Sequence, residues 1–295
     1  MLQTKLVRLY TIALIAVFIY GATPVFTKIA TATVDGITVG ALRAVVAVPL
    51  AMLVILLGRH RIPLTGNAIV LILISGGGGL VLFPVFFSWG VQLTTAGHAA
   101  AGTAFGAVMA GVLTAVIDRR MPGWPWWIGI VTGTAGAILL IWEAVGIAVA
   151  GVSWQGDALV FLGMFLGVLG YTAGARLTRQ IGSVAVTMWS VVVAAVALFP
   201  VVALYSGTDA LLAIDRDGWL SILALGWGST IVAYLFWNRA LADGGVAKIG
   251  ALQLLQPPVG IALAPLLLGE PVTLPLMVAT GIILFGVVLV QRERS

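Results

Sequence analysis

Residues 251–273 read ALQLLQPPVGIALAPLLLGEPVT, an apolar stretch that also contains several residues that disturb helices. The hydrocarbon core of a bilayer is about 30 Å thick, and a helix needs roughly 20 residues to cross it. The stretch is long enough, yet it holds two glutamines, a Pro-Pro pair, a third proline and a closing Glu-Pro. A membrane helix tolerates such residues only where a wet cavity or a neighbouring helix receives the freed polar groups.

The composition of the whole chain places this stretch in a membrane. Of the 295 residues, 61% are hydrophobic and 8% are charged, and the mean hydropathy is +1.15. Apolar runs between charges and turn residues predict ten helices, near residues 9–30, 36–57, 68–92, 98–117, 124–142, 156–177, 183–205, 219–241, 246–268 and 272–290. These long continuous runs exclude a transmembrane β-barrel, which has short alternating segments. The predicted fold class is therefore an all-α integral membrane protein.

The basic residues predict the orientation, because Lys and Arg are retained on the cytoplasmic side of a membrane. One side carries nearly all of them, namely Lys5, Arg8, Arg59, Arg61, Arg119, Arg120, Arg176, Arg179, Arg239, Arg292 and Arg294. The opposite loops hold Arg216 and most acidic residues, among them Asp35, Asp157 and Glu270. Both termini are therefore expected to be cytoplasmic. The net charge of +5 is a topology signal, and no nucleic-acid partner is expected.

The two halves of the chain are similar to each other. A shift of 148 residues superposes Lys28 on Arg176 and Trp89 on Trp237, together with several glycines. The expected domains are two five-helix repeats, residues 1–147 and residues 148–295. Because five is an odd number of crossings, the second repeat would enter the membrane from the opposite side. Inverted repeats of this kind are typical of secondary transporters.

Several motifs resemble the EamA-type repeats of the drug/metabolite transporter superfamily. The second half contains GDALVFLGMFLGVLGYTAGARL from residue 156, and an aromatic-Asn-x-Ala-Leu, a Pro-Pro and a Leu-Gly-Glu-Pro element in order within 234–290. The first half contains IYGATPVFTKIA followed by VGALRAVVAVPLAML. It departs from the pattern where Met109 matches Pro257 and where IDRRMP replaces the Leu-Gly-Glu element. This departure speaks against a strictly symmetric mechanism.

The resemblance covers nearly the whole chain, and it implies a function. The superfamily includes bacterial amino-acid exporters of the YddG kind, so the resemblance implies a multi-pass transporter of a bacterial inner membrane. It also implies that helices 1, 3, 4, 6, 8 and 9 line a central cavity. Glu270-Pro271 would form a structural or gating corner at the outer turn between helices 9 and 10.

The polar residues of the opening stretch have two interpretations. Gln253 and Gln256 are three residues apart, so they share one face of helix 9, and each carries both donors and an acceptor. They either tie helix 9 to its neighbours or line the substrate path. Pro257 and Pro258 remove backbone donors, which frees carbonyls one turn earlier. We predict that these two prolines, and Pro24 in helix 1, are hinges.

Aromatic residues recur at helical spacing in the helices expected to line the cavity. The candidates for substrate binding, besides the two glutamines, are Tyr20, Phe83, Phe87, Tyr171, Tyr234 and Trp237. Aromatic side chains of a membrane bundle also pack against one another or form interfacial belts, so both interpretations stay open.

Ionisable residues inside apolar spans are energetically expensive, and they commonly mark functional sites. Lys28, Arg43, His98 and Lys248 lie within or at the ends of predicted spans, and no carboxylate is expected deep in one. His98 and Lys248 are within a turn of helix starts and are expected to reach the interface. For Lys28 and Arg43 one interpretation is a structural ion pair with Asp35. The other is that one of them attracts a substrate carboxylate.

The sequence favours a transporter over an enzyme. It contains no His-Glu-x-x-His, no Gly-x-Ser-x-Gly and no cysteine, so no enzyme activity, metal site or cofactor is expected. The buried glutamate with which small multidrug antiporters of the superfamily exchange protons is also missing. We expect a monomeric exporter of amino acids or related small metabolites that works by alternating access. The alternatives are a proton-coupled exporter of cationic or aromatic drugs and a non-transporting scaffold or receptor.

Overall fold

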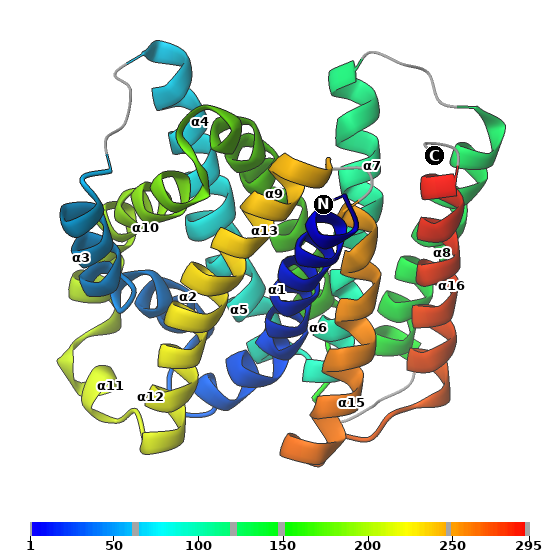
Figure 1. The fold of residues 1–295 in the computed structure, drawn as a ribbon. Coiled ribbons are helices and arrows are strands. Elements are labelled where there is room, and N and C mark those ends of the chain that lie inside the picture. Colours follow the sequence, from blue (N-terminus) through cyan, green and yellow to red (C-terminus); the bar gives the residue numbers. More distant parts are fainter. Residues whose placement is uncertain (1, 61–64, 119–122, 147–150, 246–248, 293–295) are drawn as a thin grey trace.

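The computed structural model contains only helices in the part of the chain that it describes (Figure 1). The described residues are 2–60, 65–118, 123–146, 151–245 and 249–292. The predicted all-α fold class is confirmed for these residues. Lys248, which the sequence analysis placed near a helix start, lies outside them.

The first half of the chain forms α1 (Leu2–Ala30), α2 (Gly36–Val45), α3 (Val48–Gly58), α4 (Gly66–Gly76), the π-helical η1 (Gly77–Leu82), α5 (Phe83–Leu93), α6 (Ala96–Thr103), α7 (Phe105–Asp118) and α8 (Trp124–Gly146). The second half forms α9 (Trp154–Ile181), α10 (Ser183–Pro200), the π-helical η2 (Val201–Ser206), α11 (Thr208–Leu212), α12 (Arg216–Leu223), the π-helical η3 (Ala224–Ala233), α13 (Tyr234–Gly244), the 3₁₀-helical η4 (Ala251–Leu255), α15 (Gln256–Leu268) and α16 (Leu274–Arg292).

Most of the predicted spans correspond to long apolar helices. Within the described residues, seven stretches are long and apolar enough to cross a bilayer: Leu6–Ala30, Gly36–Gly58, Gly66–Leu93, Ala96–Leu113, Trp154–Ile181, Ser183–Ser206 and Arg216–Gly244. The other three predicted spans coincide with shorter apolar helices, Trp124–Leu140, Leu252–Leu268 and Leu274–Leu289. The chain is therefore a multi-pass membrane protein, while the count of ten crossings remains a prediction.

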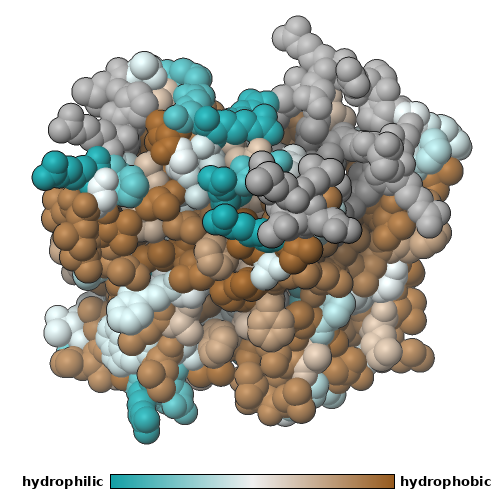
Figure 2. Space-filling model, viewed as in Figure 1, coloured by the Kyte–Doolittle hydropathy of each residue, from teal (hydrophilic) through white to brown (hydrophobic). Residues whose placement is uncertain are grey.

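The outer surface suits a lipid environment. Apolar side chains cover the middle of the face shown in Figure 2, and polar side chains gather near its two ends. Leu57, Leu204 and Leu266 are among the exposed leucines, at 77%, 85% and 78% of their surface. Such an extent of exposed apolar surface is unfavourable in water, but hydrocarbon covers it without penalty.

Short polar side chains cap the N-termini of several helices. Asp35 accepts a hydrogen bond from the backbone N–H of Thr38 (3.0 Å) at the start of α2. Ser153 does the same for Gly156 (3.1 Å) at the start of α9. These caps bind N–H groups that have no partner within the first helical turn.

Two π-helical segments occupy corresponding positions in the two halves. The same 148-residue shift that relates the halves places η1 on residues 225–230, which lie within η3. A π-helical turn locally widens an α-helix, and such turns are frequent at functional sites. The third and eighth predicted spans correspond to each other in the repeat, and both contain a π-helical segment.

Several contacts between the halves also occur in pairs. α1 packs against α13, and α9 packs against α4. α1 packs against α15, and α9 packs against α6 and α7. The pairs α2 with α10 and α8 with α16 join corresponding helices directly, and α8 and α16 run side by side in Figure 1. Exchanging predicted helices 1–5 with 6–10 converts each contact into its counterpart.

Candidate functional site

A cavity is lined by residues from both halves of the chain. The first half contributes eight of its described lining residues, Tyr20, Thr23, Arg43, Gly79, Leu80, Phe83, Phe87 and Thr103. The second half also contributes eight, Met164, Gly167, Tyr171, Ser229, Tyr234, Trp237, Gln253 and Gln256.

All the residues that the sequence nominated for substrate binding line this cavity, namely Tyr20, Phe83, Phe87, Tyr171, Tyr234, Trp237, Gln253 and Gln256. They come from predicted helices 1, 3, 6, 8 and 9, and helix 4 adds Thr103. Helix 2 was not expected to line the cavity, but it contributes Arg43. Contact of these residues with a substrate remains a prediction.

Aromatic rings form two groups on the cavity wall. Trp237 lies edge-on to Tyr20 and Tyr171, with ring centroids 6.4 and 6.2 Å apart. Phe83 and Phe87 form a tilted pair with centroids 5.2 Å apart. These separations are within the attractive range for aromatic pairs. The rings therefore pack against one another and line the cavity at the same time.

Arg43 is a buried cation held by hydroxyl groups. It lies in the last turn of α2 and is 1% exposed. Its Nε donates to Thr230 Oγ1 (3.1 Å) and its Nη2 to Ser229 Oγ (2.8 Å), and Ser229 Oγ also accepts from the Thr23 hydroxyl (3.2 Å). Nη1 has no hydrogen-bond partner. Among the described residues, no carboxylate forms an ion pair with this guanidinium.

Lys28 lies outside the cavity and stabilises the end of α5. Its ammonium donates to backbone oxygens of Val91 (3.1 Å), Gln92 (3.2 Å) and Thr94. An ammonium has three donors, so these contacts use all of them. The alternative of an ion pair with Asp35 is wrong for the described residues, because that carboxylate caps α2.

The two glutamines are buried at the cavity, with 3% of Gln253 and 4% of Gln256 exposed. The Oε1 atom of Gln253 has no hydrogen-bond partner. The Tyr171 hydroxyl is near enough to interact with Gln253, but the pair falls short of hydrogen-bond geometry. Buried amides are normally hydrogen-bonded. This acceptor is therefore available to a polar molecule in the cavity.

The Pro-Pro pair begins a helix and does not break one. η4 ends where α15 starts, and Pro257 and Pro258 lie in the first turn of α15, where N–H groups have no intrahelical partner. The Gln256 N–H donates to the Gln253 carbonyl. The expectation of a freed carbonyl is therefore wrong at Gln253, because the 3₁₀ turn supplies its donor. Pro24 lies inside α1, which continues through it. The hinge role of the three prolines remains a prediction.

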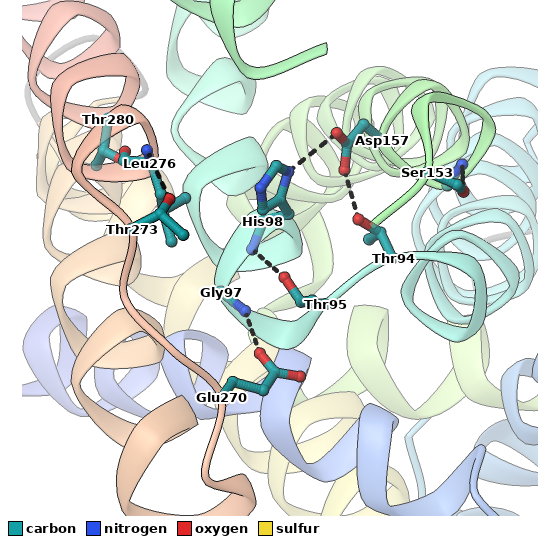
Figure 3. A network of polar contacts seen from close by, with 11 residues as sticks. Thr94, Thr95, Gly97, His98, Ser153, Asp157, Glu270, Thr273, Leu276 and Thr280 are labelled. Atoms are coloured by element: carbon teal, nitrogen blue, oxygen red, sulfur yellow. Dashed lines mark hydrogen bonds and ion pairs between the residues drawn. The ribbon is translucent and has the colours of Figure 1, made fainter. Parts of the chain in front are cut away.

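A second polar cluster lies where α6 begins, and its first part joins Asp157 to the preceding turn (Figure 3). Asp157, in the first turn of α9, is 1% exposed and accepts a hydrogen bond from the Thr94 hydroxyl (2.8 Å). Its other oxygen lies 3.1 Å from Nδ1 of His98, which is 2% exposed. The predictions of an outer-loop Asp157 and an interfacial His98 are wrong. Each of these polar side chains is buried because it has the other as its partner.

Glu270 forms the second part of this cluster. Its carboxylate oxygens accept the backbone N–H groups of Ala96 (2.9 Å) and Gly97 (3.0 Å) at the start of α6. A carboxylate at a helix N-terminus binds unpartnered donors and interacts favourably with the helix dipole. We call residues 94–98 together with Asp157 and Glu270 the inter-half cluster, because both carboxylates belong to the second half and their partners to the first.

The chemistry of the cavity is that of a binding site. Its described lining offers one guanidinium, hydroxyls, amides and aromatic rings, and it contains no acidic residue and no histidine. Across the described residues, no group of three His, Asp or Glu side chains is placed to hold a metal ion. The arrangement can bind a polar solute with an apolar part.

Comparison with known proteins places the chain among transporters. The sequence profile of the EamA-like transporter family matches residues 8–142 and 154–292. An "Uncharacterized transporter YdeK" of Bacillus subtilis is 28% identical over 278 residues, which cover 94% of this chain and 95% of that protein. A "Probable amino-acid metabolite efflux pump" of Salmonella typhimurium is 37% identical over 84 residues, 28% of this chain and 26% of that protein.

A solved structure described as "Crystal structure of protein" has the same fold. It superposes with a TM-score of 0.69 at 18% sequence identity, and the match covers 97% of this chain and 98% of that one. The two family matches fall one in each half of the chain and together cover most of it. This chain therefore belongs to the EamA-like transporter family.

Proposed function

We propose that this protein is a secondary transporter that exports amino acids or related small metabolites through its central cavity. The observation that carries the proposal is the equal contribution of the two halves, eight residues each, to the cavity lining. A site between two halves can be exposed to one side and then the other when the halves rock against each other. The mechanism is therefore alternating access, by a monomer in a bacterial inner membrane.

Two observations support a repeat relation between the halves, which this mechanism uses. Several of their packing contacts are exchanged when the halves are exchanged, and η1 and η3 occupy corresponding positions. Both π-helical segments contribute lining residues, Gly79 and Leu80 from η1 and Ser229 from η3. The irregular turns therefore lie where the halves meet the transported molecule.

The amino-acid class is supported by the relative from Salmonella typhimurium and by the cavity. That relative is named as an amino-acid metabolite efflux pump, and it matches 28% of this chain. The cavity offers a cation for the carboxylate of an amino acid. A specificity like that of YddG-type exporters is part of the proposal.

Arg43 is the residue that attracts the substrate carboxylate in this proposal. Burying a charge without a counter-ion costs several kcal/mol, and a bound carboxylate would offset that cost. Lys28 donates its hydrogen bonds to backbone oxygens at the end of α5, and its role in this proposal is structural. The same arginine disfavours cationic drugs, because two like charges would share a cavity that has no described acidic residue.

The inter-half cluster would close the outer side of the protein in the conformation described here. Asp157 and Glu270 each connect the second half to the start of α6. Movement of the halves that opens this side must break these hydrogen bonds. Their loss and recovery would accompany each transport cycle.

The test is solute flux in proteoliposomes with labelled amino acids and cationic dyes, with and without a pH gradient. We expect amino-acid flux above that of protein-free liposomes, indifferent to the gradient. Dye flux that requires a proton gradient would replace the proposal with proton-coupled drug export, and the buried His98–Asp157 pair would be the first group to mutate. Absence of any flux, together with binding of a protein partner, would favour a scaffold or receptor.

A further inference from the structure

The cavity carries one kind of charge. Arg43 is the one ionised side chain among the described lining residues, and the two glutamines present neutral amides. Interactions between charges are strong in surroundings of low dielectric constant. The ligand's charge is therefore the property that this cavity selects most strongly.

The free part of the guanidinium is suited to a carboxylate. Nε and Nη2 donate to the hydroxyls of Thr230 and Ser229, while Nη1 has no partner. An arginine has five N–H donors in a planar fork, which a carboxylate meets with two parallel hydrogen bonds. The Phe83 ring, whose centroid is 5.9 Å from Arg43 Cζ, flanks the same group. A carboxylate at Nη1 would therefore lie against an aromatic wall.

An ammonium group finds no carboxylate partner among the described residues that line the cavity. The lining acceptors without a hydrogen-bond partner, Gln253 Oε1 and the Tyr171 hydroxyl oxygen, are neutral. An ammonium there would gain a hydrogen bond to a neutral group, while Arg43 in the same cavity would repel it. These two effects oppose each other, so the ammonium adds little to binding.

The rest of the wall suits a bulky apolar body. Phe83 and Phe87 form one aromatic surface, and Trp237 with its two tyrosine neighbours forms another. Met164 also lines the cavity, and its unbranched side chain adapts to ligands of different shape. A second carboxylate on the ligand would find no second cation among the described lining residues.

We propose that the cavity takes an organic monocarboxylate with a bulky apolar body, and that its recognition by Arg43 does not require an amino group. Acids without an α-ammonium group bind as well as the matching amino acid, and the matching amines do not bind. The proposal rests on the proposed function, because it treats the cavity as the substrate site.

The experiment compares three molecules of similar size on the purified full-length protein in detergent. They are phenylalanine, 3-phenylpropionate and phenethylamine, and binding is measured by thermal stabilisation over a concentration series. We expect the two acids to stabilise the protein at similar concentrations and the amine to have no effect up to tenfold higher concentration. Arg43→Gln should weaken the response to both acids about tenfold or more, which is the range for a lost charged partner. Arg239→Gln, an exposed arginine of α13, is the matched control and should change nothing.

Three results would overturn the proposal: stabilisation by the amine equal to that by the acids, stabilisation by phenylalanine alone, or no response to any acid. If Arg43→Gln does not fold, Arg43→Lys keeps the charge and should retain a weakened preference for acids over the amine. The flux assay separates the two proposals. Amino-acid flux without the predicted ligand preference removes only this inference, whereas binding of acids without flux of any solute removes the proposed function.

Discussion

The cavity wall contains unmatched polar atoms, which can be examined at the scale of single residues. Arg43 Nη1 and Gln253 Oε1 are buried without hydrogen-bond partners, and both residues line the cavity. Leaving such groups unpaired costs about 1–3 kcal/mol each, more when charged. A protein can tolerate the free-energy cost of unpaired polar groups where a bound ligand supplies the missing partners during part of the transport cycle. The unmatched Oε1 atom of Gln253 therefore supports the proposal that this residue lines the substrate path.

The first prediction concerns these glutamines. Gln253→Leu combined with Gln256→Leu should reduce transport by about tenfold or more, because the substrate loses hydrogen-bond partners worth about 1 kcal/mol each. The protein should still fold, since leucine removes an unmatched amide. The measurement is flux in proteoliposomes together with size-exclusion chromatography. Gln155→Leu, at an exposed position of α9, is the control. Unchanged flux of every substrate in the double variant would make both glutamines structural.

The start of α15 shows how an element is positioned by its first turn. Pro257 and Pro258 fit this turn because it needs no backbone donors. The 3₁₀ turns of η4 before it place Gln253 and Gln256 at the cavity. The prolines prevent α-helical hydrogen bonds from extending toward η4. The two prolines therefore fix the boundary between η4 and α15. This boundary is a candidate bending point.

The second prediction tests this boundary. Pro257→Ala with Pro258→Ala should let the α-helix extend into η4 and turn Gln253 away from its present direction. Turnover should fall severalfold, and more than apparent affinity, because movement needs the irregular segment while the cavity wall is otherwise kept. Concentration-dependent flux gives both quantities. Pro265→Ala, inside α15 and exposed, is the matched control. Equal losses of turnover and affinity would contradict a hinge.

The third prediction concerns the link between Glu270 and α6. Glu270→Ala removes the acceptor of two N–H groups at the start of α6, which should destabilise the protein by about 1–2 kcal/mol. The same substitution should also favour opening of the outer side of the protein.

Thiol labelling can measure this opening. The chain has no cysteine, so a single Thr103→Cys substitution gives one label site in the cavity. An impermeant thiol reagent added outside cells should label it faster in the Glu270→Ala background. Asp209→Ala, exposed on α11, is the control, and an unchanged labelling rate would remove Glu270 from the outer closure.

The whole molecule is organised around the interface between its two halves. Corresponding helices pack on one another, as α8 does on α16 and α2 on α10. The cavity forms where both halves contribute irregular helices. Movement of one half against the other would therefore change access to the cavity without unfolding any helix.

The fourth prediction concerns the orientation of the molecule in the membrane. The distribution of basic residues predicts that the end of α9 near Gln180 is cytoplasmic and that α11 is outside. In intact cells, an impermeant thiol reagent should label Asp209→Cys at once and Gln180→Cys only after permeabilisation. Both positions are exposed, so burial does not bias the comparison. The opposite pattern would invert the topology and the direction assigned to export.

The sequence by itself determined the membrane class, the helical fold class, the approximate spans and eight of the sixteen described residues that line the cavity. These follow from local properties, because hydrophobic runs, glycines, prolines and aromatic spacing act within one helix or one repeat. Gln253 and Trp237 could be nominated in this way. The positions of helix ends were less certain: the predicted span at 156–177 begins at Trp154 because Ser153 caps it.

Only the tertiary structure decided which polar residues meet. Asp157 and His98 are 59 positions apart and Glu270 lies 174 positions from Ala96, so no local pattern reveals these contacts. The structure also placed Lys28 against the end of α5 and Arg43 in the cavity, although both are cations within predicted apolar spans. The physical reason is that burial and pairing of a charge depend on what neighbouring helices present to it. That arrangement is fixed by packing between helices, which a single sequence does not display.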